Sequence, residues 1–334
     1  MANDRFLIIR LSSLGDIVLT APAVAMLRGS FPDARIDWLI DKKWAALFSG
    51  CTDFHEVIEI AGSAVHNFMS TVQHLRKARY TCVIDFQGLY KSALLAFLST
   101  APRRIGLARG FAREGGAAMF YTERIVPSCE HIVDQNRALA RAAGAGPERF
   151  PPGFPRLTIA PEEIVRRTVG CSLKQFFVIN AGGGWGSKCW PADRYGILCR
   201  ELEARYAFRA VVNYGPGERA LADSVARAAS PAEVVFFCGE IQELTSLLAG
   251  AKFVVAGDTG PLHLAVAMGT PVVGLYGATD WVRNGPYNRD DIIVCNDRFE
   301  GMMHQRGHQP AASMLSITVE QVLAAVAQRL EKTA

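Results

Sequence analysis

The sequence lacks the patterns that mark disulfide-rich, zinc-binding, secreted and membrane-spanning proteins. None of its eight cysteines belongs to a Cys-x-x-Cys pair, and several lie in apolar runs, which favours reduced, structural thiols over disulfides or zinc ligands. No apolar run approaches the length of a membrane span, and the run Phe6–Ile9 is too short for a signal peptide. We therefore expect a cytoplasmic protein.

Two nucleotide-binding fingerprints are also missing. The loop Leu11–Asp16, after the first apolar run, has no G-x-G-x-x-G triplet, which disfavours an NAD-dependent oxidoreductase. The segment Gly182–Lys188 is not a P-loop, because Ser187 separates the last glycine from the lysine and Cys189 takes the Ser/Thr position. No Asp-x-Asp pair stands beside the glycine-rich loops, so we expect that neither a cofactor nor a divalent metal is required.

Charge is distributed unevenly along the 334 residues. Lys and Arg outnumber Asp and Glu by 19 to 14 over residues 1–160, whereas the counts are 17 and 18 over 161–334. This excess favours an acidic partner for the N-terminal half, and much of it comes from Arg103, Arg104, Arg109, Arg113 and Arg124. These arginines lack the aromatic interleaving or helix-turn-helix pattern of nucleic-acid-binding proteins. A phosphorylated lipid or sugar at a membrane surface and a solvated basic face both stay open as interpretations.

The order of apolar patterns predicts the fold class. Half of the residues are hydrophobic, which is enough for two cores in a chain of this length. Short β-branched runs alternate with helical patterns, as in parallel sheets covered by helices, and a proline- and glycine-rich stretch at 145–160 interrupts the alternation. The predicted strands are 7–9, 35–40, 81–85 and 124–126 in the first half, and 176–180, 209–213, 233–237, 253–256, 271–276 and 292–294 in the second. We predict two Rossmann-like, doubly wound α/β domains, 1–155 and 156–317, and a C-terminal helix, 318–334, that packs back across the domain junction.

The stretch Gly257–His263 joins a predicted strand to a predicted helix. Such a turn presents unpaired backbone N–H groups and the positive end of a helix dipole to an anion. Pro261 suits the first helical turn, and Asp258 or Thr259 can cap it. The stretch therefore predicts a site for a ligand that carries a diphosphate, with His263 either touching that ligand or packing in a hydrogen-bonded core.

Two further loops carry candidate functional residues. Asp16 follows the first strand and lies at the N-terminus of a helical pattern, Ile17–Leu27. A helix N-terminus favours an ionised carboxylate, so Asp16 is either a general base toward a hydroxyl or a helix cap. In the loop Gly182–Lys188, glycines allow close approach of backbone to a ligand and Lys188 offers a cation to phosphate oxygens. The alternative is a plain flexible loop.

Taken together, these segments resemble glycosyltransferase family 9, the lipopolysaccharide heptosyltransferases. The resemblance follows the family order over nearly the whole chain and is carried by Ser12–Thr20, Lys188–Pro191 and Gly257–His263. Heptosyltransferase I is a better match than heptosyltransferase II over Asp85–Ala93, Arg104–Gly106, Ala112–Glu114 and Met119–Tyr121. The resemblance implies a GT-B fold, an ADP-heptose donor held by the C-terminal domain, and an acceptor, the Kdo of phosphorylated lipid A, held by the N-terminal domain.

The resemblance also implies a role for individual residues. Asp16 and Lys188 match the catalytic positions, Asp16 as the base. The implied donor-binding residues are Gly182, Gly183, Gly184, Lys188, Glu218, Asp258, Thr259, Gly260 and His263, with Glu218 on the ribose. The implied acceptor-binding residues are Ser12, Ser13, Gln87, Lys91, Arg104 and Arg113. The chain departs from heptosyltransferase I where Gly182, Gly183 and Gly184 replace the hydroxyl residues of the diphosphate loop, so backbone amides would take over those contacts.

The implied reaction is an inverting transfer of heptose from ADP-heptose to Kdo. Asp16 would take the proton of the attacking hydroxyl while Lys188 stabilises the leaving diphosphate. We expect a monomer at the cytoplasmic face of the inner membrane, with no nucleic-acid partner. Heptosyltransferase II and protein heptosyltransferase are alternatives within the family, and an NAD-dependent oxidoreductase and a non-catalytic nucleotide-sugar-binding protein are alternatives outside it. His304 and His308 receive no role.

Overall fold

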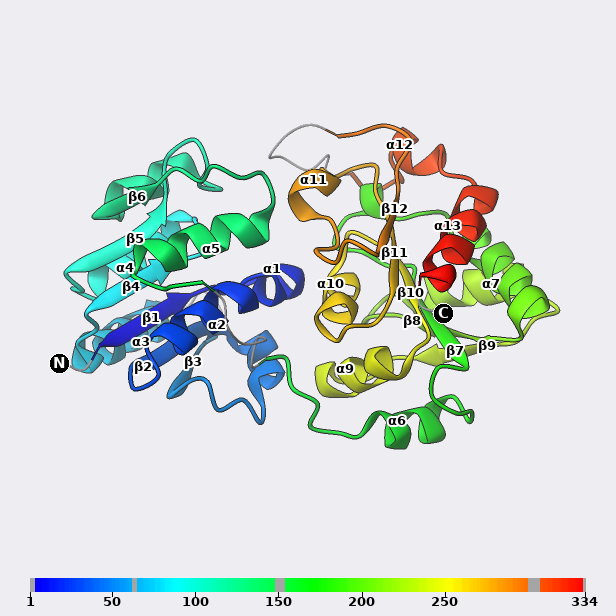
Figure 1. Cartoon of the computed structure of the whole chain (residues 1–334), viewed down its shortest axis with the longest axis horizontal. Helices are drawn as coiled ribbons and strands as arrows, with labels where there is room; N and C mark the ends of the chain where they lie inside the picture. Colours follow the sequence, from blue (N-terminus) through cyan, green and yellow to red (C-terminus); the bar gives the residue numbers. More distant parts are fainter. Residues whose placement is uncertain (1–3, 62–64, 148–153, 300–306, 333–334) are drawn as a thin grey trace. The chain divides into compact units, whose positions relative to one another are not determined.

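The computed structural model describes residues 4–61, 65–147, 154–299 and 307–332. The chain forms two compact units, Met1–Arg156 and Leu157–Ala334 (Figure 1). Part of the predicted linker, residues 148–153, and His304 lie outside the described residues. Within the described ranges, no helix combines the length and the hydrophobicity needed to cross a bilayer.

The first unit is built on a parallel sheet of six strands in the described part of the chain, in the order β3-β2-β1-β4-β5-β6. The strands are β1 (Arg5–Ile9), β2 (Arg35–Asp41), β3 (Glu56–Ile60), β4 (Cys82–Asp85), β5 (Arg103–Leu107) and β6 (Glu123–Ile125). Leu7, Ile8 and Ile9 are fully buried on both faces of β1. Continuous apolar runs of this kind are typical of parallel sheets with helices on both sides.

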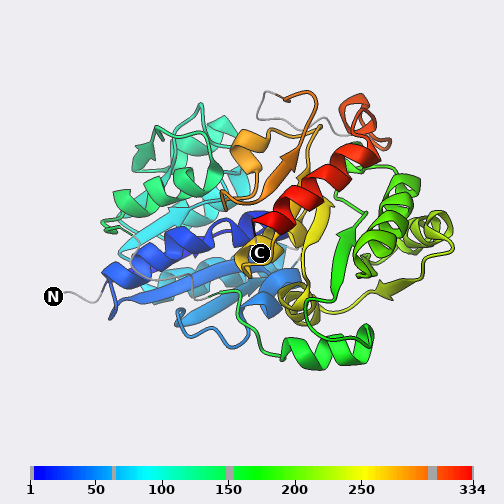
Figure 2. The same ribbon diagram turned by 45° about the vertical axis from the view of Figure 1, so that its right-hand side comes forward.

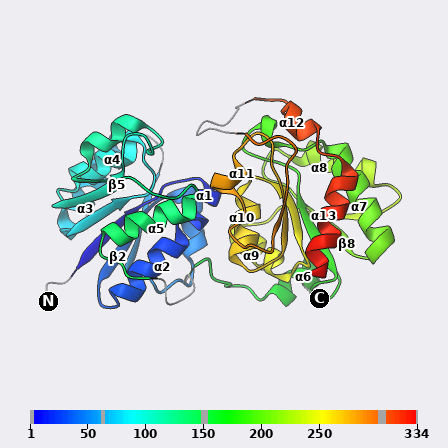
Figure 3. The ribbon, with the colours of Figure 1, turned by 45° about the horizontal axis from the view of Figure 1, so that its top comes forward.

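Helices cover both faces of this first sheet. They are α1 (Leu14–Val18), α2 (Ala21–Ser30), η1 (Lys42–Phe48), α3 (Val65–Ala78), α4 (Tyr90–Leu98), η2 (Gly115–Phe120) and α5 (Ile132–Ala142). Figure 3 shows α3 and α4 on one side of the sheet and α2 and α5 on the other, in agreement with the contacts of α3 with α4 and of α2 with α5. The face with α4 also receives η2.

The second unit repeats the architecture with the strand order β12-β11-β10-β7-β8-β9, again all parallel among the described residues. Its strands are β7 (Phe176–Asn180), β8 (Arg209–Asn213), β9 (Val234–Phe237), β10 (Val254–Gly257), β11 (Val272–Leu275) and β12 (Ile292–Val294). Every residue of β7, β10 and β11 is buried. The two predicted parallel α/β sheets are therefore observed.

The second sheet is also covered by helices. They are α6 (Pro161–Thr168), η3 (Gly186–Lys188), α7 (Ala192–Tyr206), α8 (Arg219–Ala229), α9 (Ile241–Gly250), α10 (Gly260–Ala267), α11 (Trp281–Asn284), α12 (Ala312–Leu315) and α13 (Val319–Glu331). The helix α13 (red in Figure 2) contacts β11, β12 and α7, and its Val322 and Val326 join the core of this unit. The C-terminal helix that the sequence places at the domain junction thus packs on the second sheet.

One helix differs from its prediction. The sequence predicts a single helical pattern from Ile17 to Leu27, but the structure has two helices, α1 and α2, separated at Leu19 and Thr20. Pro22 occupies the first turn of α2, where its missing N–H costs nothing, whereas in a continuous helix its ring would clash with the preceding turn. The Thr20 hydroxyl donates to the Asp16 carbonyl across the break at 2.8 Å.

The end of the first unit is fixed by an aromatic cluster. Phe154 is 3% exposed and packs edge-on against Trp38, with ring centroids 5.1 Å apart, and face-to-face against Phe48 at 4.9 Å. Phe54 completes the cluster at 5.6 Å from Phe154. Aromatic pairs in such arrangements contribute beyond the area they bury, so the chain is anchored just before it leaves the first unit.

Replacing Phe154 by alanine is expected to lower the free energy of unfolding of the first unit by about 3–5 kcal/mol, because it leaves a cavity among three rings. Urea unfolding followed by tryptophan fluorescence measures the change, since Trp38 belongs to the cluster. Leu157→Ala is the control. Leu157 is 46% exposed, so its substitution should change the free energy of unfolding by less than about 0.5 kcal/mol. Equal effects of the two substitutions would show that the cluster does not anchor the chain.

Candidate functional site

In the first unit, Asp16 lies directly beyond the carboxyl end of β1, in the first turn of α1. Its carboxylate oxygen Oδ2 accepts hydrogen bonds from the Ser13 backbone N–H at 3.1 Å and from the Ser13 hydroxyl at 3.0 Å. The Asp16 side chain nevertheless keeps 28% of its surface exposed. It caps the start of α1 and can also be reached by a ligand, so both roles considered for it are compatible with its geometry.

Arg10 is a partner of Asp16 that the sequence analysis did not identify. Its guanidinium lies 2.6 Å from Oδ1 of Asp16, is 5% exposed, and also donates to the Phe86 carbonyl. Burial raises the pKa of Asp16, but Arg10, the two Ser13 donors and Arg113 outweigh it and hold that pKa below its usual value. Asp16 is therefore ionised at neutral pH. The signal in the sequence that could have identified Arg10 is that it is a charged residue directly after the apolar run Phe6–Ile9.

The loop after β4 is tied to the loop that carries Asp16. Oε1 of Gln87 accepts from the backbone N–H groups of Leu11 at 2.9 Å and Ser12 at 3.1 Å. Gln87 is 2% exposed, and its Nε2 has no hydrogen-bond partner among the described residues. A buried donor without a partner is costly, so the Gln87 side chain is held here by the two bonds of its oxygen and not by its nitrogen.

Asp85, another residue that the sequence analysis did not identify, holds this second loop in place. Its Oδ1 accepts from the backbone N–H groups of Gln87 and Gly88, and its Oδ2 accepts from the hydroxyls of Ser92 at 2.8 Å and Tyr121 at 2.6 Å. Burial is the largest influence and raises the pKa of Asp85. The network connects β4, α4 and the end of η2, so it positions Gln87 from three elements.

The structure brings most, not all, of the implied acceptor residues together. Ser12, Ser13 and Gln87 surround the Asp16 loop, and the Arg113 guanidinium lies 4.0 Å from the Asp16 carboxylate. Lys91 is in the first turn of α4, which follows this edge of the sheet.

Arg104 is elsewhere. It is next to the amino end of β5, paired with Val83, and donates to the carbonyls of Ala101 and Phe120. Parallel strands put their carboxyl ends at one edge, which explains why a residue at the start of β5 does not join the cluster around Asp16.

In the second unit, Asp258 is the centre of a buried charged cluster. Its Oδ2 lies 2.8 Å from Nζ of Lys188, and its Oδ1 accepts from Nε2 of His263 at 3.0 Å. All three side chains are buried: Asp258 is 9% exposed, Lys188 11% and His263 4%. Burial raises the pKa of Asp258, but His263 and Lys188 outweigh it and hold that pKa well below its usual range.

Next to this cluster is the amino end of α10. Thr259 is the residue before the helix, Pro261 is in its first turn, and the Thr259 hydroxyl is buried without a partner among the described residues. Gly257 is required for close packing, because a Cβ there would lie 2.9 Å from the Lys188 carbonyl oxygen. Backbone N–H groups, a free hydroxyl and a lysine thus surround one helix N-terminus, an arrangement suited to phosphate oxygens.

The glycine-rich loop and Glu218 meet beside this cluster. A Cβ on Gly182 would collide with the Glu218 carboxylate, whose Oε2 accepts from the Gly215 N–H at 2.7 Å. A Cβ on Gly183 would lie 3.6 Å from the Thr259 methyl group, whereas one on Gly184 would face open space. The structure therefore brings the implied donor residues together within one unit, including Glu218.

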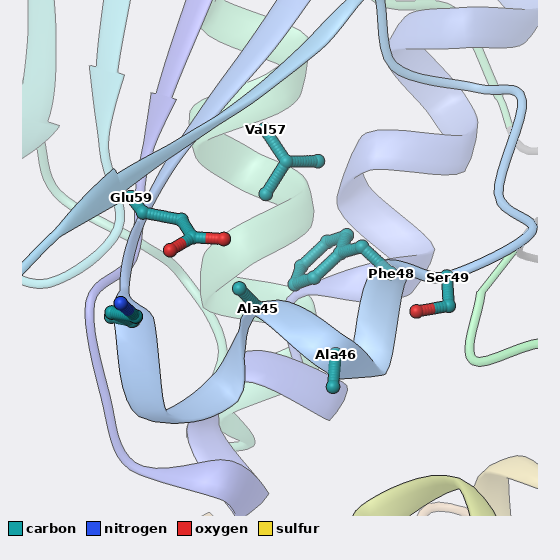
Figure 4. A pocket seen from close by; sticks show the side chains of 7 residues that line it. Ala45, Ala46, Phe48, Ser49, Val57 and Glu59 are labelled. Atoms are coloured by element: carbon teal, nitrogen blue, oxygen red, sulfur yellow. The ribbon is translucent and has the colours of Figure 1, made fainter.

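Hollows also lie away from these two clusters, and one of them is lined by Arg5, Arg28 and Arg35. A pocket of about 430 Å³ lies between η1 and β3, and Figure 4 shows Phe48, Val57 and Glu59 turned toward it. Within the described ranges, no three His, Cys, Asp or Glu side chains are grouped as metal ligands require. His308 is exposed and lies beside Gly186.

Comparison with known proteins identifies the family. A model of glycosyltransferase family 9, described as heptosyltransferase, matches residues 68–312. The chain belongs to glycosyltransferase family 9. The family membership and the enzyme class expected from the sequence are thereby confirmed, and the oxidoreductase hypothesis is not supported.

Individual relatives agree with the family match over most of their length. Lipopolysaccharide heptosyltransferase 1 of Pseudomonas aeruginosa is 30% identical over 88% of this chain and 84% of its own. Lipopolysaccharide heptosyltransferase 3 of Escherichia coli is 25% identical over 96% of both chains. The solved structure of E. coli heptosyltransferase WaaC with ADP covers 98% of each chain with a TM-score of 0.72 at 24% identity, which confirms the GT-B fold.

The pairing at Asp258 predicts how stability depends on pH. Because the pKa of Asp258 is lower in the folded state, the ionised pair stabilises the protein above the unfolded pKa of about 3.9, and this contribution is lost as the pH falls toward the folded pKa. Asp258→Asn should therefore destabilise the second unit by about 3–5 kcal/mol at pH 6 and by less at pH 3.

Urea unfolding of both proteins at the two pH values measures this difference. Asp297→Asn, which removes an exposed carboxylate of the same unit, is the matched control and should have little effect at pH 6. If wild type and Asp258→Asn differ in free energy of unfolding by the same amount at pH 6 and pH 3, the assigned ion pair is contradicted.

Proposed function

We propose that this glycosyltransferase transfers heptose from ADP-heptose to the Kdo of the lipopolysaccharide inner core, with inversion at the anomeric carbon. The observation that carries the proposal is the cluster of Lys188, Asp258 and Thr259 at the amino end of α10, which is suited to a diphosphate. The curated relatives named for lipopolysaccharide heptosyltransferase, and a solved relative named as holding ADP, support the choice of substrates.

The second unit is proposed to bind the donor. Lys188 and the N–H groups near Thr259 and Gly260 stabilise the negative charge that develops on the leaving diphosphate. Glu218 reaches the ribose, since its carboxylate lies against the glycine loop at Gly182. The backbone of Gly182, Gly183 and Gly184 contacts the phosphates in place of side-chain hydroxyls. The hydrogen bond from His263 orients the Asp258 carboxylate toward the sugar of the donor.

The first unit is proposed to bind the acceptor. Asp16 accepts the proton of the attacking hydroxyl while the new carbon–oxygen bond forms and the bond to ADP breaks. An aspartate with a lowered pKa is a weak base, so proton transfer accompanies bond formation instead of preceding it. Ser12, Ser13, Gln87, Lys91 and Arg113 orient the acceptor and its phosphates.

The choice of acceptor is part of the proposal. The N-terminal segments resemble heptosyltransferase I, whereas relatives named heptosyltransferase 1 and heptosyltransferase 3 match at similar identity. Heptosyltransferase II and protein heptosyltransferase remain the alternatives, and turnover of each acceptor distinguishes them. We further propose that the protein is a monomer in the cytoplasm, associated with the inner face of the membrane, and that it needs no metal.

Calorimetric titration with ADP, UDP and NAD tests the donor site first. ADP is expected to bind best, and Lys188→Met is expected to weaken ADP binding about tenfold or more, because a charge-assisted bond to phosphate is lost. The control is Lys332→Met, at the exposed end of α13, with unchanged affinity. Preference for UDP would overturn the ADP-heptose assignment, and tight NAD binding would overturn the enzyme class.

Asp16→Asn tests the base. Its turnover with ADP-heptose and Kdo-lipid A is expected to fall roughly 10²- to 10⁴-fold, as is typical when a general base is removed, with unchanged affinity for ADP. Asp33→Asn removes an exposed carboxylate of the same unit and should keep full turnover. Near-normal turnover of Asp16→Asn would assign Asp16 to helix capping alone.

A further inference from the structure

The outer face of α4 is apolar, which is unusual for a surface helix. Its inner face is buried through Ser92, Ala93, Leu95 and others, whereas Tyr90 and Phe97 are 52% and 49% exposed. These two residues are seven positions apart, about two helical turns, and therefore share one face. Surface helices normally carry charged residues there, but Lys91 is the single charged residue in the sequence of Tyr90–Leu98.

The apolar face of α4 continues onto η2. Met119 is 70% exposed, and the ring centroid of its neighbour Phe120 lies 5.8 Å from that of Phe97. The Tyr90 hydroxyl lies over Gly116, where any Cβ would collide with it. Tyr90, Phe97, Met119 and Phe120 thus form one surface, which we name the α4–η2 surface.

Positive charge borders the α4–η2 surface. The Arg104 guanidinium lies 5.6 Å from the Phe97 ring centroid and donates to the Phe120 and Ala101 carbonyls. Nε of Arg124 donates to the Ala118 carbonyl. Carbonyls are neutral, and no carboxylate of the described residues forms an ion pair with either arginine. Both positive charges therefore remain for an external anion.

We infer that the α4–η2 surface docks the enzyme on an anionic lipid bilayer, an inference that rests on the proposed function for its biological use. Exposed apolar side chains beside arginines match the interfacial region of such a bilayer, where apolar groups enter the acyl boundary and cations meet lipid phosphates. An anionic bilayer accounts for both the apolar surface and the unpaired positive charge at its border, whereas a soluble partner protein accounts for them less directly.

The location of the α4–η2 surface fits this role. The helix α4 begins at the loop that carries Gln87, and the Glu114 carboxylate accepts from the Tyr90 N–H at 2.6 Å. The segment with Arg113 is thereby fastened to the start of α4. A docked α4 places the proposed acceptor-binding loops within about one helix length, roughly 13 Å, of the lipid headgroups, which suits an acceptor whose anchor stays in the bilayer.

Sedimentation with lipid vesicles tests the docking directly. Wild type should sediment with vesicles of phosphatidylethanolamine and phosphatidylglycerol (3:1). It should not sediment with vesicles of pure phosphatidylcholine. The double substitution Phe97→Ser/Met119→Ser should weaken binding about tenfold, because exposed apolar area no longer enters the bilayer. Arg124→Gln should weaken it about fivefold at low salt. The matched control is Tyr206→Ser/Leu315→Ser, which alters side chains 38% and 45% exposed in the second unit.

Activity separates this inference from the proposed function. On Kdo-lipid A in vesicles the double variant should lose turnover about tenfold, whereas on a deacylated, water-soluble acceptor it should match wild type and thereby prove that it is folded. If wild type binds the anionic vesicles but transfers no heptose, the proposed function fails and the docking stands. Equal sedimentation of wild type and double variant, or conversion of a wild-type dimer to a monomer by the substitutions, would overturn the docking.

Discussion

Parallel strand pairing is the constraint on which both functional clusters depend. In each described sheet all strands run in one direction, so the loops that follow them gather at a single edge. That edge assembles Arg10, Asp16 and Gln87 from segments up to 77 positions apart in the first unit, and Lys188, Glu218 and Asp258 in the second. Side chains from loops that are distant in the sequence are thus brought together by the sheet.

The central carboxylates of the two clusters, Asp16 and Asp258, differ in burial and in their partners. Asp258 is nearly inaccessible and satisfied by two basic side chains, so its geometry is fixed before any ligand arrives. Asp16 shares one oxygen with Arg10 and the other with Ser13 but retains an exposed edge. Removing Arg10 or Lys188 would leave the paired carboxylate without its cation, which costs more than the ion pair itself contributes. The fixed geometry of Asp258 suits the proposed donor site, and the exposed edge of Asp16 suits its proposed role as the base.

The sequence predicted the sheets better than the details of the sites. Buried runs such as Phe176–Asn180 identify central strands because both faces are apolar, whereas β3 and β5 were missed. The edge strand β3 contains two glutamates, and β5 begins with two arginines and contains Gly106, so neither has an apolar run. Local patterns placed Asp16 and Asp258 correctly at the ends of strands. Arg10 and Asp85 were missed because no local pattern marks them: Arg10 joins Asp16 to the Phe86 carbonyl, and Asp85 joins its own loop to Tyr121, arrangements that only the folded sheet produces. Arg104 was grouped with residues from which the sheet separates it.

The contact between Gly182 and Glu218 makes these two positions interdependent. A side chain at 182 can exist only if the glutamate moves or is replaced by a smaller residue, so the effects of changing both will not add. A hydroxyl residue introduced at position 182, to restore the diphosphate loop typical of heptosyltransferase I, would displace the group proposed to hold the ribose. The glycine run is thus coupled to the acidic residue: a side chain at 182 either displaces the Glu218 carboxylate or requires a smaller residue at 218.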